Sequence, residues 1–137
     1  MIIRDATKKD LPQCEKLIKI PEFEFCEGGF PDIPFLSNYL EKDFFLIAEE
    51  DNKILGCVIG EKLKSKVIMI WYLVVDSSIR GKGIGNQLMN EFEKRAKQNG
   101  FKWSLLQAPL ESSKTLEFYQ KNGYNKGKSF IEYNKAL

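Results

Sequence analysis

The sequence predicts an α/β or α+β domain built on a mixed β-sheet with helices beside it. Its 137 residues are enough for one domain with a sizeable core, so we expect residues 1–137 to form a single domain. The hydrophobic pattern supports this fold class, because it alternates between short apolar runs typical of strands and the three-to-four spacing typical of helices. The expected order of elements is β-α-α-β-β-β-α-β-α-β.

Capping residues and chain breakers delimit the elements of the first half. Asp10 and Gln13 have the spacing of a capping box, and a proline is tolerated in the first turn of the helix that would follow. Prolines and glycines then interrupt the apolar pattern. We therefore expect an edge strand over 1–4, a helix from about 10 to 19, a loop over 21–34, a short helix over 35–41, and strands over 44–49 and 54–61.

The second half begins with Val67–Val75, the most apolar stretch of the chain. Nine residues are too few to span a membrane, so this stretch predicts a central strand covered on both faces. Trp71 and Trp103 fall within expected strands and are predicted to lie in the core. The remaining elements are expected to be a helix from about 83 to 100, a strand over 101–107, a helix over 112–122 and a strand over 129–133.

Composition excludes several classes of function. The 21 basic and 19 acidic residues nearly balance, and only three of the basic ones are arginine, which argues against a nucleic-acid partner. The chain has no histidine, so histidine-dependent catalytic triads and most zinc sites are excluded. Its three widely spaced cysteines predict neither a disulfide framework nor a metal site. We expect no metal and no membrane partner, and the first residues carry no secretory signal, which predicts a cytoplasmic protein.

A glycine-rich loop directly follows the expected central strand. It consists of Arg80-Gly81-Lys82-Gly83-Ile84-Gly85 and leads into the next helix. Glycines leave backbone N–H groups open to a ligand, and the start of the helix adds further N–H groups and the positive end of its dipole. With the two cations, these groups predict a phosphate or pyrophosphate site; the alternative is a tight turn with solvated cations. The spacing matches neither a Walker loop nor a dinucleotide-binding fingerprint.

The loop resembles the cofactor signature of the GNAT N-acetyltransferases, a family that binds acetyl-coenzyme A (acetyl-CoA). Arg80, Gly83 and Gly85 occupy the fixed positions of the signature Q/R-x-x-G-x-G/A, directly after a long apolar strand. The opening segment, residues 3–10, also resembles the first strand and helix of the family, so the resemblance covers essentially the whole chain. It implies the GNAT fold, in which a central sheet splays apart near the middle of the Val67–Val75 strand and the cofactor occupies the gap.

A second motif of the family follows downstream. Segment 112–124 resembles N-x-x-A-x-x-x-Y-x-x-x-G-F/Y and matches it at Tyr119, Gly123 and Tyr124. Ser112 stands where asparagine is usual, and Thr115 where alanine is usual. The resemblance implies that Tyr119 is the general acid, whose phenol donates a proton to the sulfur of coenzyme A. The alternative is a tyrosine that packs its helix on the sheet.

The resemblance also implies a set of cofactor-binding residues. Backbone groups near the end of the central strand would bind the pantetheine arm, and the amides of the glycine loop would bind the pyrophosphate. Acetyl-CoA is the expected co-substrate. The implied set is Leu73, Val74, Val75, Arg80, Gly81, Lys82, Gly83, Ile84, Gly85 and Ser112.

Carboxylates and phenylalanines alternate in the expected loop over 21–34, which covers the acceptor site in the family. Glu22, Glu24 and Glu27 are therefore predicted to bind a cationic primary amine on a small molecule or a peptide. The alternative is a solvated loop whose aromatic rings cap the core. The usual positions of the family's general base correspond to Met69 and Gln107, which do not accept a proton, so the base would be an ordered water or a loop carboxylate.

These observations together predict an acetyl-CoA-dependent N-acetyltransferase that acts as a monomer or homodimer. Two other functions remain open at this point. One is a catalytically inactive acyl-CoA-binding GNAT-fold module that serves as a sensor or interaction partner, and the missing base favours it. The other is a phosphate-binding regulatory domain unrelated to coenzyme A, which would bind nucleotides equally well.

Overall fold

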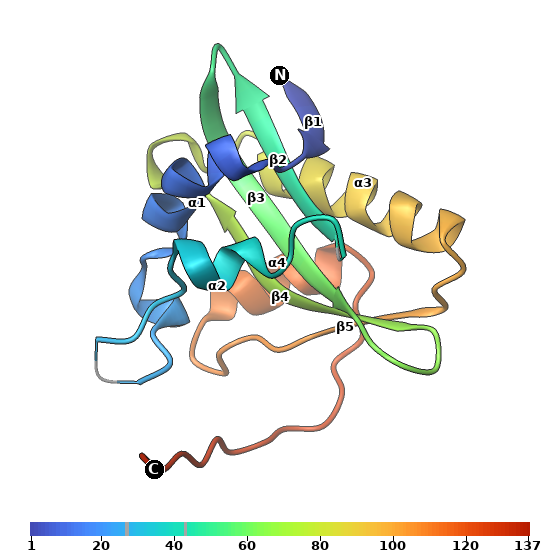
Figure 1. The fold of residues 1–137 in the computed structure, drawn as a ribbon. Coiled ribbons are helices and arrows are strands. Elements are labelled where there is room, and N and C mark those ends of the chain that lie inside the picture. Colours follow the sequence, from blue (N-terminus) through green and yellow to red (C-terminus); the bar gives the residue numbers. More distant parts are fainter. Residues whose placement is uncertain (27, 43) are drawn as a thin grey trace. The chain divides into compact units, whose positions relative to one another are not determined.

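A five-stranded mixed β-sheet organises the first 107 residues of the chain (Figure 1). The computed structural model describes residues 1–26, 28–42 and 44–137, which form two compact units, Met1–Gln107 and Ala108–Leu137. No helix among these described residues is long and apolar enough to cross a lipid bilayer. The second unit contains α4 (Ser113–Lys121), and the first contains β1 (Ile2–Asp5), α1 (Leu11–Ile18), α2 (Ile33–Ser37), β2 (Phe44–Glu50), β3 (Lys53–Lys62), β4 (Val67–Val75), α3 (Ile84–Gln98) and β5 (Trp103–Leu106).

The strands lie in the order β1-β2-β3-β4-β5. The first four pair antiparallel, whereas β5 pairs parallel to β4. A parallel pair requires a crossover connection, and α3 provides it. Helices α1 and α2 lie on one face of the sheet and α3 lies on the opposite face (Figure 1). The predicted fold class, a mixed sheet flanked by helices, is confirmed.

Each face of the sheet has its own core. Ile18 of α1 and Leu36 of α2 pack in one cluster with Ile59 of β3, and all three are fully buried. On the other face, α3 buries the apolar stripe that its sequence predicts. Phe92 of that stripe packs where Gly60 of β3 has no side chain, because a Cβ atom at Gly60 would collide with the ring. The close approach of α3 to the sheet therefore depends on this glycine.

The start of α1 agrees with the prediction, but the predicted capping box is wrong. The helix begins at Leu11, and no side-chain hydrogen bond from Asp10 caps it. Instead, Arg4 donates to both carboxylate oxygens of Asp10, each at 2.9 Å, and the Thr7 amide donates at 2.7 Å. The Gln13 side chain also bonds elsewhere, to the Asn52 carbonyl in the turn between β2 and β3 and to the Ile54 amide at the start of β3. The strong ion pair with Arg4 outcompetes a helix cap for the Asp10 carboxylate.

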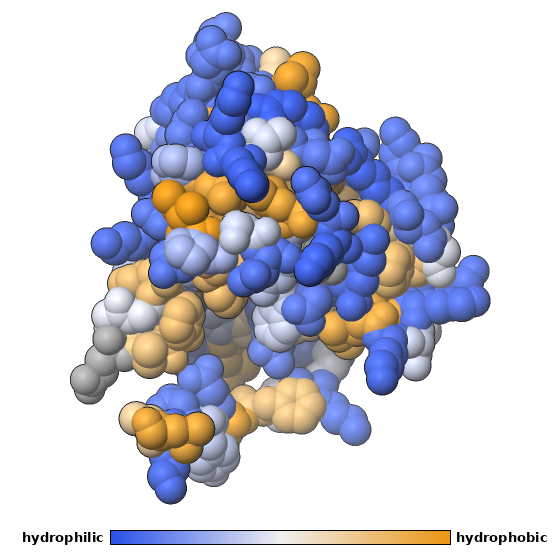
Figure 2. Space-filling view, viewed as in Figure 1, coloured by the Kyte–Doolittle hydropathy of each residue, from blue (hydrophilic) through white to orange (hydrophobic). Residues whose placement is uncertain are grey.

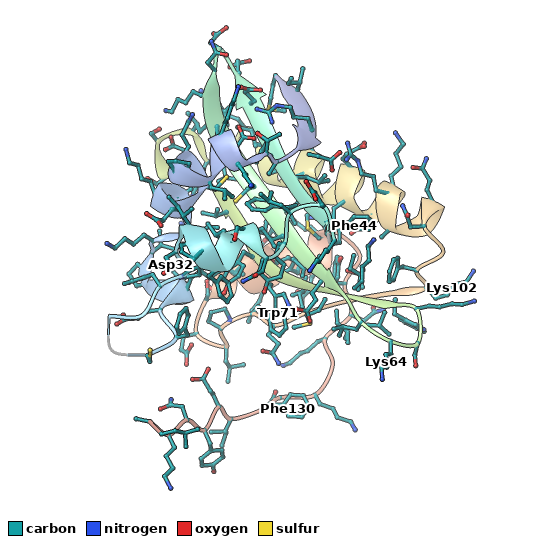
Figure 3. The ribbon with its side chains drawn as sticks, in the orientation of Figure 1. Asp32, Phe44, Lys64, Trp71, Lys102 and Phe130 are labelled. Atoms are coloured by element: carbon teal, nitrogen blue, oxygen red, sulfur yellow. The ribbon has the colours of Figure 1, made fainter. Side chains whose placement is uncertain are left out.

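α2 begins and ends earlier than predicted, at Ile33 and Ser37. Asp32 (labelled in Figure 3) explains the start, because its carboxylate accepts a hydrogen bond from the Phe35 amide at 2.9 Å and caps the helix. Pro34 lies in the first turn, where its missing N–H has no helical partner to lose. The proline therefore belongs to the helix and not to the preceding loop.

The predicted strand over 129–133 is absent from the structure. All residues of the second unit, Ala108–Leu137, are described, and α4 is the one regular element that they form. Phe130, Ile131 and Tyr133 are each more than three-quarters exposed. The alternating pattern of a strand gives it no stability without a partner strand, and this unit contains none.

The two tryptophans predicted for the core are exposed. Trp103 is 72% exposed on β5, an outer strand of the sheet. Trp71 is 42% exposed in the middle of β4 (Figure 3). The core at this part of the sheet is formed by smaller apolar residues instead of the tryptophans. Ile68, Met69 and Ile70 of β4 are the buried ones.

Candidate cofactor and acceptor site

β4 separates from β5 halfway along its length. The two strands pair only as far as Ile70 and Leu106, and β4 continues to Val75. On its other edge β4 pairs with β3 from Ile68 to Val75, except at Trp71, which is the extra residue of a bulge. A bulge bends its strand and increases the local twist, which accounts for the separation. The splay predicted near the middle of this strand is confirmed, and residues 71–75 have no β5 residue beside them.

The glycine loop lies at the end of this unpaired half of β4. Gly81 and Gly83 have φ values of +82° and +78°, a left-handed conformation that disfavours other residues. A Cβ atom at either position would meet nothing within 4 Å, so both face open space. Gly83 is also the N-cap of α3, and the side chain of Ile84 is buried, which leaves the backbone amide as its polar group. The loop thus offers amides and the positive end of a 15-residue helix to a ligand.

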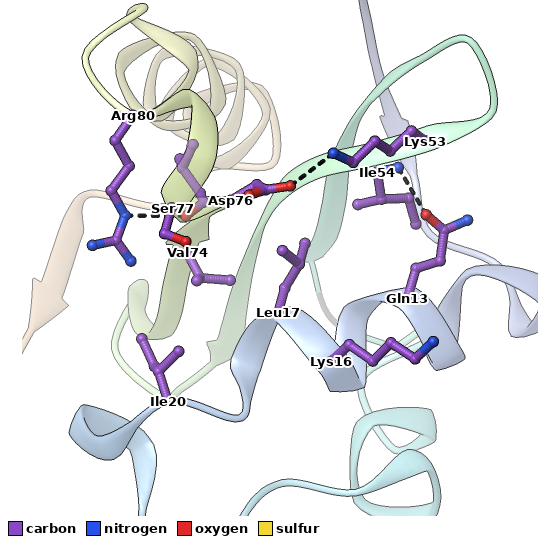
Figure 4. A pocket seen from close by; sticks show the side chains of 11 residues that line it. Gln13, Lys16, Leu17, Ile20, Lys53, Ile54, Val74, Asp76, Ser77 and Arg80 are labelled. Atoms are coloured by element: carbon purple, nitrogen blue, oxygen red, sulfur yellow. Dashed lines mark hydrogen bonds and ion pairs between the residues drawn. The ribbon is translucent and has the colours of Figure 1, made fainter.

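A pocket of about 540 Å³ lies between α1 and the end of β4 (Figure 4). Its apolar lining comes from Leu17 of α1, Ile20 just after that helix, Ile54 of β3 and Val74 of β4. This volume lies within the range of small-molecule sites. Three residues that the sequence predicted to bind the cofactor line this pocket: Val74, Val75 and Arg80. Leu73, also predicted, directly precedes Val74 on β4.

Positive charge surrounds the pocket. Lys16, Lys53 and Arg80 line it; Lys53 forms an ion pair with Asp76, the single carboxylate of the lining, so Lys16 and Arg80 supply the net positive charge. The Arg80 Nε donates to the carbonyl of Val75 at 3.2 Å, which holds the guanidinium beside the end of β4. Such a field attracts an anionic ligand. Sequence reasoning missed Lys16, Lys53 and Asp76, because no local pattern indicates that α1 and the start of β3 approach this end of β4.

The predicted acceptor loop packs against the unpaired half of β4. The Phe23 ring lies 5.0 Å from that of Tyr72, and the Phe35 ring lies 6.3 Å from it. Phe25 extends this cluster toward solvent, since it is 50% exposed and its ring lies 6.2 Å from Phe35. Figure 2 shows apolar residues gathered at the left side of the molecule, over this loop. Burial raises the pKa of Tyr72, so its hydroxyl is protonated at neutral pH.

The predicted acceptor-binding glutamates have different surroundings. Glu24 accepts a hydrogen bond from the Gly28 amide at 2.8 Å and so holds its own loop. Glu22 is exposed and has no hydrogen bond or ion pair within the part of the chain that the structure describes. Glu27 lies outside the described residues. Glu15 of α1 is a further carboxylate of this region, and it accepts from the Ile33 amide at 2.8 Å.

The remaining predicted residues, Ser112 and Tyr119, belong to the second unit. The Ser112 hydroxyl donates to Thr115 Oγ1 at 2.7 Å within the first turn of α4. The Tyr119 ring lies 5.2 Å from Phe118 and 5.8 Å from Tyr124. Burial raises the pKa of Tyr119 to about 12. Its phenol is therefore a hydrogen-bond donor at any pH at which the protein would work.

The sheet, its splay and the glycine loop define the class of this protein, and a family model confirms it. The model, described as an acetyltransferase (GNAT) domain, matches residues 41–126. The chain belongs to the GNAT acetyltransferase family. An uncharacterized N-acetyltransferase of Methanocaldococcus jannaschii is 31% identical over 90 residues, which are 61% of this chain and 40% of that protein. The chain thus spans less than half the length of this curated relative.

Solved structures share the fold at low sequence identity. An aminoglycoside acetyltransferase from an uncultured soil metagenomic sample, crystallised with sisomicin, has a TM-score of 0.80 and 23% identity, over 99% of this chain and 95% of that one. A Mycobacterium tuberculosis protein in complex with CoA and NLQ has a TM-score of 0.77 and 19% identity, over 97% of this chain and 76% of that one. At these identities the likeness establishes the fold.

The described residues fit coenzyme A. Left-handed glycines leave a cradle for phosphate oxygens, and the cations around the pocket match their charge. The unpaired edge of β4 offers backbone groups to an extended, amide-containing arm, as a strand offers them to another strand. Leu73, Val74 and Val75 would bind that arm, and the amides from Gly81 to Gly85 would bind the pyrophosphate.

Proposed function

We propose that this chain is an N-acetyltransferase that transfers the acetyl group of acetyl-CoA to a primary amine by direct attack. The observation that carries the proposal is the open glycine cradle at the unpaired end of β4, in a member of the GNAT family. The positive field of Lys16 and Arg80 supports an anionic co-substrate at this end of β4.

Tyr119 is the residue that we assign to the departing sulfur. Bound acetyl-CoA supplies a thioester carbonyl that a neutral amine attacks, so that the C–N bond forms and the C–S bond breaks. The Tyr119 phenol, with its pKa raised to about 12, donates a hydrogen bond to the negative charge that develops on sulfur. A thiol has a reference pKa near ~8.5, so at equilibrium the phenol keeps its own proton. The proton that the amine nitrogen loses ends on the sulfur, and the products are the amide and the free thiol.

The acceptor is a cationic amine in this proposal. Glu22 and Glu24 flank Phe23, whose ring packs on Tyr72 of β4, and their charge, with that of Glu27 in the same segment of the sequence, would draw an ammonium group to the site. Of Glu22 and Glu24, Glu22 is the better placed to bind it, since Glu24 already holds the Gly28 amide. Because no histidine is present, deprotonation through water is expected to follow the pKa of the amine itself.

An acetyl-transfer assay over a panel of amines, with release of the free thiol as readout, tests the proposal. Primary amines are expected to be acetylated faster than alcohols or anionic acceptors, with a rate that climbs from about pH 7 to 9 and no inflection near ~6.5. Tight binding of coenzyme A without transfer to any amine would instead indicate an inactive acyl-CoA-binding module. Equal competition by unrelated nucleotides would contradict a site specific for coenzyme A.

A further inference from the structure

The turn that joins β4 to the glycine loop is held by one carboxylate. Asp76 Oδ1 accepts hydrogen bonds from the Ser78 amide at 3.0 Å and from its hydroxyl at 2.8 Å. The Asp76 carbonyl accepts from the Ile79 amide at 3.0 Å, and its own amide donates to Leu55 at 2.8 Å. These bonds shape the short 3₁₀ turn Ser77–Ile79, which directly precedes the loop.

A second residue ties this turn to the body of the sheet. Lys53, the first residue of β3, places Nζ 3.0 Å from Asp76 Oδ2 (Figure 4). Lys53 is itself held in place, because Gln13 of α1 bonds to both sides of it. Gln13 Oε1 accepts from the Ile54 amide at 3.0 Å, and Gln13 Nε2 donates to the Asn52 carbonyl at 3.3 Å. The contacts therefore run from α1 through β3 to the turn before the glycine loop.

We infer that Asp76 and Lys53 are positioning residues for the cofactor, which hold the glycine loop in its binding conformation before coenzyme A arrives. This inference rests on the proposed role of the loop in binding coenzyme A. A loop that is ordered in advance loses less conformational entropy on binding, so its affinity is higher. Neither residue needs to touch the cofactor for this effect, because both act through the backbone of Ser78 and Ile79.

The sign of the charge on Asp76 makes the inference testable. A carboxylate beside an anion-binding loop repels phosphate, so a purely electrostatic effect of removing it would tighten coenzyme A binding. A positioning role has the opposite consequence, since removal would loosen the turn and weaken binding. The Ser78 amide and Lys53 lower the pKa of Asp76 to about 2, so the group is ionised throughout the working range of pH.

The experiment is a calorimetric titration of the full chain with coenzyme A. Asp76→Ala is expected to weaken binding roughly fivefold or more, the size of effect that follows from ordering a short loop on binding. Asp76→Asn keeps an oxygen that accepts from the Ser78 amide, and is expected to lose less. Lys53→Arg is expected to retain the affinity that Lys53→Met loses, because it restores the ion pair.

Hydrogen exchange of the ligand-free protein provides a readout that does not depend on coenzyme A. In Asp76→Ala and Lys53→Met, the hydrogen-bonded amides of Ser78 and Ile79 are expected to exchange roughly fivefold faster or more, and the double variant no faster than Asp76→Ala. Lys94→Met is the matched control, since it removes a lysine from another exposed ion pair, with Glu91 on α3. It is expected to change neither affinity nor loop exchange.

Several outcomes would overturn the inference. It is wrong if Asp76→Ala binds coenzyme A as tightly as the unaltered chain or more tightly, or if the Ser78 and Ile79 amides keep their exchange rates in both variants. A Gly83→Val variant in the same titration distinguishes this failure from failure of the proposed function. If Gly83→Val loses affinity for coenzyme A while Asp76→Ala does not, the result supports the cofactor site at the loop and refutes the positioning role of Asp76.

Discussion

Substitution of Gly83 tests the cofactor site most directly. Gly83 adopts φ +78° and caps α3, and a Cβ atom there would meet no protein atom within 4 Å. A valine side chain would therefore occupy the space that phosphate oxygens need, without colliding with the protein. Its cost to folding comes from the backbone alone, because a β-branched residue in this left-handed region costs about 1–3 kcal/mol.

The expected loss of affinity is larger than that of one neutral hydrogen bond. A hydrogen bond to a charged group contributes about 1.5–3 kcal/mol, so blocking one amide–phosphate bond weakens coenzyme A binding roughly 10- to 150-fold. Gly83→Asn separates the two effects of the substitution. Asparagine tolerates the left-handed conformation and is a good N-cap, so the free energy of unfolding is expected to change by less than about 1 kcal/mol while affinity still falls at least about tenfold.

Isothermal titration with coenzyme A and chemical denaturation of the same samples provide the two measurements. Gly100 is the matched control, because it has φ +83°, also faces open space, and follows the other end of α3. It lies more than ~20 Å from the loop along the helix. Gly100→Val is expected to lower stability by a similar amount and to leave affinity unchanged. If Gly83→Asn binds coenzyme A normally, or if Gly100→Val weakens binding equally, the loop is not the phosphate site.

Three further predictions follow from individual side chains. Tyr119→Phe is expected to lower turnover roughly 10²-fold with little change in coenzyme A affinity, because it removes only the phenol proton; a variant with normal turnover would make Tyr119 a packing residue. Glu22→Gln is expected to raise the acceptor KM and leave coenzyme A affinity unchanged in steady-state kinetics, and an unchanged KM would show a solvated loop. Arg4 lowers the pKa of the buried Asp10 to about 2, below its unfolded value of 3.8, so this ion pair contributes about 2 kcal/mol above ~pH 4 that is lost as the pH falls toward 2. Arg4→Ala is therefore expected to unfold about 2 kcal/mol more easily at pH 7 in denaturant titrations, with a difference that shrinks toward pH 2; a constant difference would contradict the reasoning.

The sequence alone was sufficient for the elements with strong local patterns. Val67–Val75 agrees with β4 residue for residue, because the short length of this apolar run, its polar flanks and its many β-branched residues all favour a strand over a helix. The stripe of α3 and the glycine loop before it were also evident from spacing. The motif around Arg80 and the tyrosine segment of α4 were enough to identify the family, which the family model confirms.

The tertiary structure decided which side chains meet. The bulge at Trp71, the ion pair between Lys53 and Asp76, and the bonds of Gln13 to the turn between β2 and β3 join residues far apart in the chain. Local propensity carries no information about such pairs, because it depends on neighbouring residues in the sequence. The partner of each side chain is instead set by which distant residues the fold brings within contact distance. The predicted strand over 129–133 was wrong for the same reason, since an alternating pattern becomes a strand only where another strand can accept its backbone hydrogen bonds.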